Sequence, residues 1–84
     1  MTEKGQVFRS LAGRDKGRLL AAVSSEGPYL RVCDGKERPL ANPKRKNPRH
    51  LQNTERRLTD SQMTSDRALR KALAVMEAEM RQGR

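Results

Sequence analysis

Short apolar runs, separated by glycine, proline and charged residues, occupy the first two-thirds of the chain. The clearest runs are residues 5–11 (GQVFRSL), 18–23 (RLLAAV) and 29–34 (YLRVCD). In the third run, Leu30 and Val32 alternate with their neighbours, and a period of two indicates a strand with one buried face. The pattern therefore predicts three strands.

Two more strands are predicted by shorter patterns. The Asp-Gly pair at 34–35 is typical of a type I′ hairpin turn, in which both central residues have positive φ, and a strand at 37–40 (ERPL) would follow it. A brief strand at 50–52 (HLQ) would complete the sheet. Four or five short strands favour a mainly β fold, a small SH3-like barrel whose interior suits the small Ala21 and Ala22.

The periodicity becomes helical near the C-terminus. Apolar residues recur there with the spacing of one helical stripe, and they are Leu69, Ala72, Leu73, Met76 and Met80. Ser65 or Thr64 can cap the start of this helix. We therefore predict a barrel domain over residues 1–54, a linker over 55–64 and a C-terminal α-helix over 65–82.

Charge narrows the range of partners. The 84 residues include 19 Lys and Arg against 10 Asp and Glu, which gives a net charge of +9. Such a charge favours polyanions, first nucleic acid and then acidic membranes, although it also keeps a protein soluble. The apolar runs are too short for a membrane span or a signal peptide, so we expect a cytoplasmic protein with no membrane role.

Residues 13–18 (GRDKGR) place much of this charge on one bend. Two glycines there permit a tight turn, and the aspartate between them can fix it by bonding its own backbone. The side chains of Arg14, Lys16 and Arg18, with free backbone N–H groups beside them, would then suit phosphate oxygens. The alternative is a solvated hairpin whose charges only prevent strand pairing.

A second basic run follows at residues 42–50 (NPKRKNPRH). Its two prolines disfavour helix and sheet interior, which predicts an extended, exposed loop. This loop would act as a phosphate-binding arm, or it is merely solvated. Its candidate RNA-binding residues are Lys44, Arg45, Lys46 and Arg49.

Residues 13–23 (GRDKGRLLAAV) resemble the KOW motif of ribosomal proteins and transcription elongation factors. The order of DG, PKRKN and His-Leu-x-x-Thr that follows resembles a short bacterial KOW-domain RNA-binding family, similar to an archaeal and eukaryotic large-subunit ribosomal protein. The resemblance covers about residues 4–54, and Leu20 stands where the broader pattern has glycine. It implies an SH3-like barrel that binds structured RNA, with ribosomal RNA as first choice. The RNA-binding residues that the resemblance implies are Arg14, Asp15, Lys16, Gly17 and Arg18, with Lys44, Arg45 and Lys46 as a second cluster.

Catalysis finds little support in the sequence. The chain has one His and one Cys, His50 and Cys33, which is too few for a metal site, so we expect no enzyme, no metal and no cofactor. With Phe8 and Tyr29 as the only aromatics, binding should use phosphate and shape more than base stacking. Two rival functions remain, a protein-interaction adaptor that uses the helix stripe and a non-specific binder of double-stranded DNA. The stripe would either pack on the barrel or dock on another protein.

Overall fold

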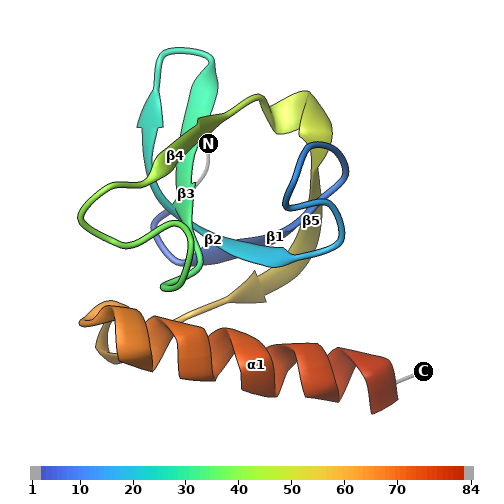
Figure 1. Ribbon diagram of the computed structural model, residues 1–84, viewed down its shortest axis with the longest axis vertical. Coiled ribbons are helices and arrows are strands. Elements are labelled where there is room, and N and C mark those ends of the chain that lie inside the picture. The colour runs from blue at the N-terminus through green and yellow to red at the C-terminus, as the bar shows by residue number, and fades with distance from the viewer. Residues whose placement is uncertain (1–2, 83–84) are drawn as a thin grey trace.

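Within residues 3–82, which the computed structural model describes, five strands and one long helix build the fold (Figure 1). The strands are β1 (Gln6–Ser10), β2 (Leu19–Glu26), β3 (Tyr29–Cys33), β4 (Lys44–Lys46) and β5 (Leu51–Arg57). Two 3₁₀ turns, η1 (Pro48–His50) and η2 (Asp60–Met63), flank β5, and the α-helix α1 spans Asp66–Gln82. The prediction of a mainly β fold with a C-terminal helix is confirmed.

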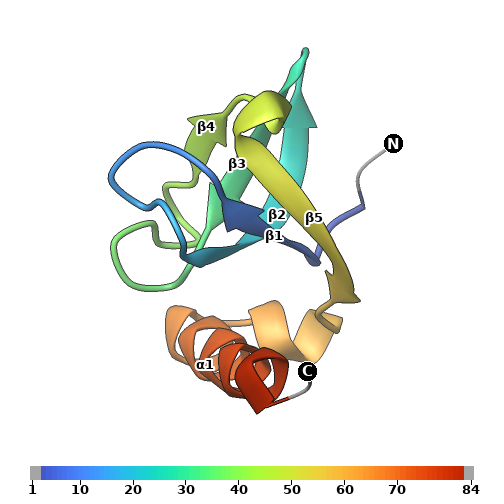
Figure 2. The ribbon, with the colours of Figure 1, turned by 90° about the vertical axis from the view of Figure 1, so that its right-hand side faces the viewer.

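The strands form one antiparallel sheet in the order β4-β3-β2-β1-β5. The register of β2 against β3 shifts between Ala22 and Ser24, and that of β1 against β5 shifts between Val7 and Phe8. Such irregularities increase the bend of a strand, and the sheet curls round on itself (Figure 2). No strand pairing joins β4 to β5 within residues 3–82, so these two strands are the edges of an open sheet.

Both faces of the curled sheet bury apolar side chains. The inner face carries one cluster, made of Phe8, Leu20, Ala22, Leu30, Val32 and Leu51. The outer face carries a second cluster with Val7, Leu19, Ala21 and Cys33, which α1 covers. Because its successive side chains alternate between two buried faces, β2 begins with an unbroken apolar run.

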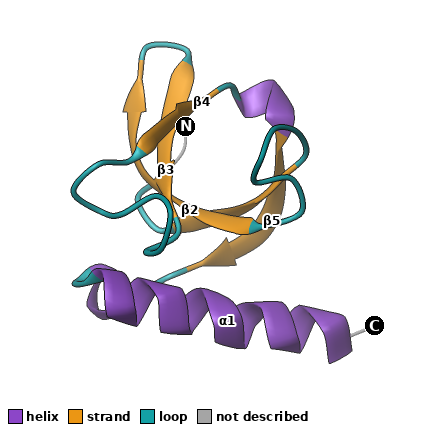
Figure 3. Cartoon of the chain, in the orientation of Figure 1, coloured by secondary structure: helices purple, strands orange, loops and turns teal. Residues whose placement is uncertain are grey.

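The helix lies across the outer face of the sheet, below the ring of strands in Figure 3. It begins where predicted, because the Ser65 hydroxyl accepts a hydrogen bond from the backbone N–H of Ala68 (3.1 Å). Its Leu69, Leu73 and Met76 are buried in the outer cluster. Of the two roles predicted for the apolar stripe, the structure shows packing on the sheet.

The strand predicted at residues 37–40 is wrong. Asp34 does not take positive φ, so there is no type I′ turn. Its side-chain Oδ1 instead accepts the backbone N–H groups of Lys36 and Arg38, both at 2.9 Å. The chain then continues as a loop over residues 34–43, and β3 pairs with β4 rather than with 37–40.

The linker predicted over residues 55–64 is also wrong. The strand expected at 50–52 spans Leu51–Arg57, and η2 begins at Asp60, so most of the predicted linker has regular structure. Leu58 and Met63 are buried beneath α1. This segment is therefore part of the core, and it anchors the helix to the sheet.

Candidate nucleic acid interface

Residues 11–18 join β1 to β2 in a compact loop. The backbone N–H of Gly17 donates to the carbonyl of Ser10 (2.8 Å), and that of Ser10 donates to the carbonyl of Arg18 (2.9 Å). Gly13 and Gly17 both have φ of 88°, a conformation that glycine adopts without strain. The two glycines therefore allow the tight turn that the sequence predicted.

A buried ion pair fastens this loop to β4. Nζ of Lys46 donates to Oδ1 of Asp15 (2.6 Å) and to the carbonyl of Ala12 (2.8 Å). The Ser10 hydroxyl donates to the same Oδ1 (2.8 Å). Asp15 and Lys46 are each only 6% exposed. The aspartate thus fixes the loop, but through side chains from two strands and not through its own backbone as predicted.

The carboxylate of Asp15 is held in its charged form. Burial by itself opposes ionisation, but the hydrogen bonds from Lys46 and Ser10 and the charges of Lys46 and Lys44 outweigh it and lower the pKa of Asp15. Its second oxygen, Oδ2, is buried without a hydrogen-bond partner among the described residues and lies 3.9 Å from Nζ of Lys44. The negative charge is consequently enclosed by cations and withdrawn from the surface.

The loop and the β4–η1 segment together surround a shallow hollow of about 260 Å³. It is lined by Ala12, Gly13, Lys44, Arg45, Lys46, Asn47 and His50. The backbone N–H of Leu11 donates to the carbonyl of His50 (2.8 Å), which adds a second link between the two segments. Figure 2 shows this loop, at the left in blue, beside β4. Two basic runs that are far apart in the sequence are therefore neighbours in space.

Several cations remain accessible on these two segments. Arg14, Lys16, Arg45 and Arg49 are exposed, and the side chain of Lys44 is 31% exposed. We call these five side chains the cationic end. The guanidinium of Arg45 lies over the ring of Tyr29, 4.9 Å from its centroid, which orders this arginine.

Four of the predicted site residues are not part of the cationic end. Gly17 contributes only backbone, at a positive φ in the turn. Asp15 and Lys46 are buried in their mutual pair, so the prediction of a fully exposed loop at 42–50 is wrong for Lys46, which ends β4. Arg18 leaves the bend on the side of the 34–43 loop, with Nη1 3.4 Å from Glu37 and 3.9 Å from Asp34. It therefore belongs to a different surface from the cationic end.

Two important residues escaped the sequence analysis. Ser10 holds Asp15 in place. Arg9 joins the loop to α1, because its Nη1 donates to the carbonyl of Gly17 (2.7 Å) and to Oε1 of Glu77 (3.0 Å). A polar residue at a buried strand position is the only signal that marks Ser10, and the partner of Arg9 is 68 residues away.

The single Cys and the single His of the chain lie in different surroundings. Cys33 is buried under the helix, and burial, with the nearby Asp34 and Asp66, raises its pKa to about 12. A thiol with so high a pKa stays protonated and is a poor nucleophile. His50 is exposed in η1. Over residues 3–82, no three His, Cys, Asp or Glu side chains gather as metal ligands, and no helix is long and apolar enough to cross a membrane.

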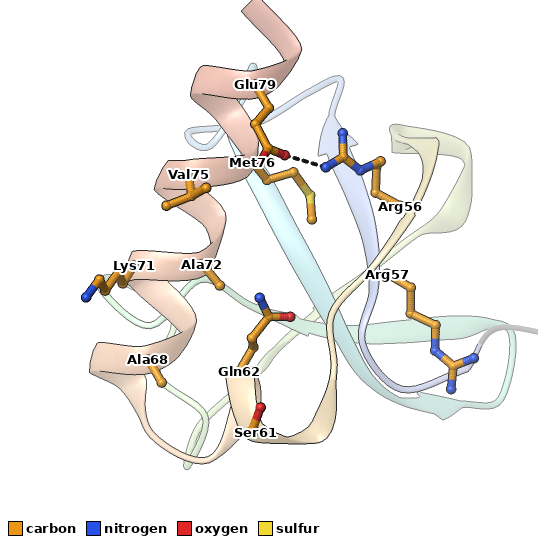
Figure 4. A pocket seen from close by; sticks show the side chains of 10 residues that line it. All are labelled: Arg56, Arg57, Ser61, Gln62, Ala68, Lys71, Ala72, Val75, Met76 and Glu79. Atoms are coloured by element: carbon orange, nitrogen blue, oxygen red, sulfur yellow. Dashed lines mark hydrogen bonds and ion pairs between the residues drawn. The ribbon is translucent and has the colours of Figure 1, made fainter. Parts of the chain in front are cut away.

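A second hollow, of about 470 Å³, lies between α1 and the β5–η2 segment (Figure 4). Ala72, Val75 and Met76 give it an apolar wall, and an ion pair between Arg56 and Glu79 spans one end. Val75 is 53% exposed. Leu69 and Leu73 of the predicted stripe are buried on the sheet, so this groove is the helix surface that an adaptor would offer.

No protein-family model and no curated protein matches the chain. The positions and charges of its own side chains define the candidate interface.

Proposed function

We propose that this chain is a non-catalytic RNA-binding protein that holds its ligand mainly by phosphate and shape contacts from the cationic end. The observation that carries the proposal is the bond of Lys46 to both Asp15 and Ala12. This bond joins the 11–18 loop to β4 and so brings two basic runs to one end of the molecule. Neither run alone would present as many cations.

The electrostatics of this end support an anionic ligand. Its one local carboxylate, that of Asp15, is buried and compensated by Lys46 and Lys44. The fully exposed charged side chains of the cationic end, Arg14, Lys16, Arg45 and Arg49, are all positive. Because the loop is tied to a strand, little conformational entropy is lost when its cations meet phosphates, and less ordering on binding favours affinity.

The choice of RNA over DNA rests on the resemblance to KOW proteins. We propose that the curled sheet corresponds to their SH3-like barrel, and its five short antiparallel strands around an inner apolar cluster support this. Structured RNA in the ribosome is then the first-choice ligand, which would place the protein in the cytoplasm. The shortage of aromatic residues agrees with contacts to phosphate rather than to bases.

The test is the salt dependence of binding to a labelled ribosomal RNA hairpin, measured by fluorescence anisotropy. The variant Arg14→Gln/Lys16→Gln should bind at least about tenfold more weakly at 0.1 M salt. Its slope of log affinity against log salt should fall by about 0.7–0.9 for each lost phosphate contact. The matched control, Arg67→Gln/Lys71→Gln, removes the same charge from exposed positions on α1 and should keep most of the slope.

Different results would favour the rival functions. Equal losses in the two variants would mean that only total charge matters, and this would contradict a defined interface. Equal affinity for DNA and RNA duplexes of one sequence would favour a non-specific duplex binder. An absence of RNA binding, together with a protein partner lost on Val75→Asp, would favour the adaptor.

A further inference from the structure

A cleft of about 520 Å³ separates the base of the 11–18 loop from α1. It is lined by Gly17, Arg18, Leu19, Asp34, Lys36, Arg70, Leu73, Ala74, Glu77 and Arg81. Four of these side chains are cations, and they come from three separate parts of the chain. The cleft adjoins the loop at Gly17 and Arg18.

The acidic groups of the cleft are engaged within the protein. Oδ1 of Asp34 accepts two backbone N–H groups. Both oxygens of Glu77 face cations, with Nη1 of Arg9 at 3.0 Å from Oε1 and Nε of Arg81 at 3.5 Å from Oε2. The negative charges of both carboxylates are thus already balanced within the protein, by backbone N–H groups at Asp34 and by two arginines at Glu77.

The basic groups retain capacity for an outside ligand. Lys36 is exposed and has no ion-pair partner among residues 3–82. Arg70 donates through Nη1 to the carbonyl of Gly35 (2.9 Å), which leaves other donors of its guanidinium. The side chain of Arg81 is 78% exposed. Arg18, held at 3.4 Å from the exposed Glu37, joins this cleft to the loop.

The spacing of these cations suits an extended polyanion better than a single ion. Arg70 and Arg81 lie about 16 Å apart along the helix axis, at ~1.5 Å per residue. An RNA strand presents phosphates continuously over such a length. Between them the helix lines the cleft with Leu73, Ala74 and Glu77. Both oxygens of Glu77 already face cations of the protein, so the free surface there is mainly apolar and selects no particular base.

We propose that this cleft binds the sugar–phosphate backbone of an RNA strand that continues past the loop, and that α1 forms its second wall. This inference rests on the proposed function and extends it, because it assigns the C-terminal helix a direct part in RNA binding. The contacts are made by Lys36, Arg18 and Arg81, while Arg70 holds the 34–43 loop against the helix. Arg9 and Glu77 set the width of the cleft by joining the loop to α1.

The test compares three double variants of the full chain on one labelled RNA hairpin with a single-stranded extension. Lys36→Gln/Arg81→Gln alters the cleft, Arg14→Gln/Lys16→Gln alters the cationic end, and Arg67→Gln/Lys71→Gln is the control with equal charge. All six positions are exposed, so each variant should keep its fold, which circular dichroism checks. We expect the RNA affinity of the cleft variant to fall roughly five- to tenfold per lost contact at 0.1 M salt. The slope of its log affinity against log salt should decrease by about 0.7–0.9 per contact.

The outcomes separate the two proposals. The cleft variant could bind RNA like the control while the variant of the cationic end binds more weakly. This result would overturn RNA binding in the cleft and leave the proposed function standing. If neither variant differs from the control, both proposals fail. Shortening the single-stranded extension should lower the RNA affinity of the wild-type protein and leave that of the cleft variant unchanged. An equal loss of affinity in both proteins would contradict a single strand bound in the cleft.

Discussion

Two loops of this protein, residues 11–18 and 34–43, each surround a buried aspartate, and they hold it in different ways. Asp34 is bonded by backbone N–H groups of its own loop, two and four residues ahead. Asp15 is bonded by the side chains of Ser10 and Lys46, and Lys46 lies 31 residues away on another strand. The 34–43 loop is therefore shaped by bonds within its own sequence, whereas the 11–18 loop is fixed by residues from other strands.

This difference has a functional consequence. The bonds to Asp34 set only the shape of their own loop. That loop is held against α1 by separate bonds, from the Leu40 N–H to Asp66 and from Arg70 to the carbonyl of Gly35. The bond between Asp15 and Lys46 also sets the position of β4 relative to the loop, and thereby of the cations on both. The role of the buried pair is therefore to hold these two segments together.

The largest predicted effect comes from breaking that pair. Lys46→Met should lower the free energy of unfolding by about 4 kcal/mol, because it leaves the buried Asp15 carboxylate without its main cation. Urea denaturation of the full chain measures this. Lys44→Met is the matched control, since Lys44 is partly exposed and 3.9 Å from Asp15, and it should cost less than about 1 kcal/mol. Equal costs would contradict the special role of Lys46.

The glycines of the two loops come next. Gly35 has φ of 79°, and a Cβ there would meet the backbone carbonyl of Asp66 at the start of α1. Gly35→Ala should therefore cost about 3 kcal/mol, from backbone strain plus overpacking. Gly17 has φ of 88° but nothing within 4 Å of a built Cβ, so Gly17→Ala should cost only about 1 kcal/mol. Thermal unfolding measures both costs, and equal values would mean that the 34–43 loop is not pressed against the helix.

Replacing each aspartate by asparagine tests the comparison most evenly. Asp15→Asn should cost about 2 kcal/mol, because the hydrogen bond from the Lys46 ammonium then loses its charged acceptor. Asp34→Asn keeps an oxygen that accepts the N–H groups of Lys36 and Arg38, and it should cost less than about 1 kcal/mol. Similar values for the two variants in urea denaturation would mean that charge matters equally in both loops.

A smaller effect is expected from pH. The fold lowers the pKa of Asp15 below its ordinary value of 3.8. A carboxyl with a lowered pKa stabilises the fold above its unfolded pKa, and this contribution is lost as pH falls through the folded value. The difference in unfolding free energy between wild type and Asp15→Asn should thus be greatest above about pH 5 and shrink below about pH 4. A difference that stays constant down to about pH 2.5 would argue against this shift.

Local patterns in the sequence predicted much of the fold. The alternation at Leu30 and Val32 located β3, and the stripe from Leu69 to Met80 located α1 with its Ser65 cap. The two glycines of the 13–18 bend indicated the turn. In each case the signal and the structure lie within a few residues of one another, as hydrogen bonds in turns and helices do.

Contacts between distant residues were missed. The strand β4 has three cations and flanking prolines, and only its pairing with β3 makes it a strand. The core positions of Leu58 and Met63 depend on the helix that follows, so no periodicity marks them. The sequence analysis named all five side chains of the cationic end, but it could not tell that Lys46 turns inward to Asp15 while Arg14 and Lys16 remain outside.

The most direct test of the cationic end is a titration of the ¹⁵N-labelled chain with the RNA hairpin, followed by backbone amide shifts in NMR spectra. Our account predicts the largest changes at residues 13–18 and 44–50, with little change at Gly27 on the hairpin between β2 and β3. Changes confined to the groove in Figure 4, at Ala68, Ala72 and Val75, would contradict it.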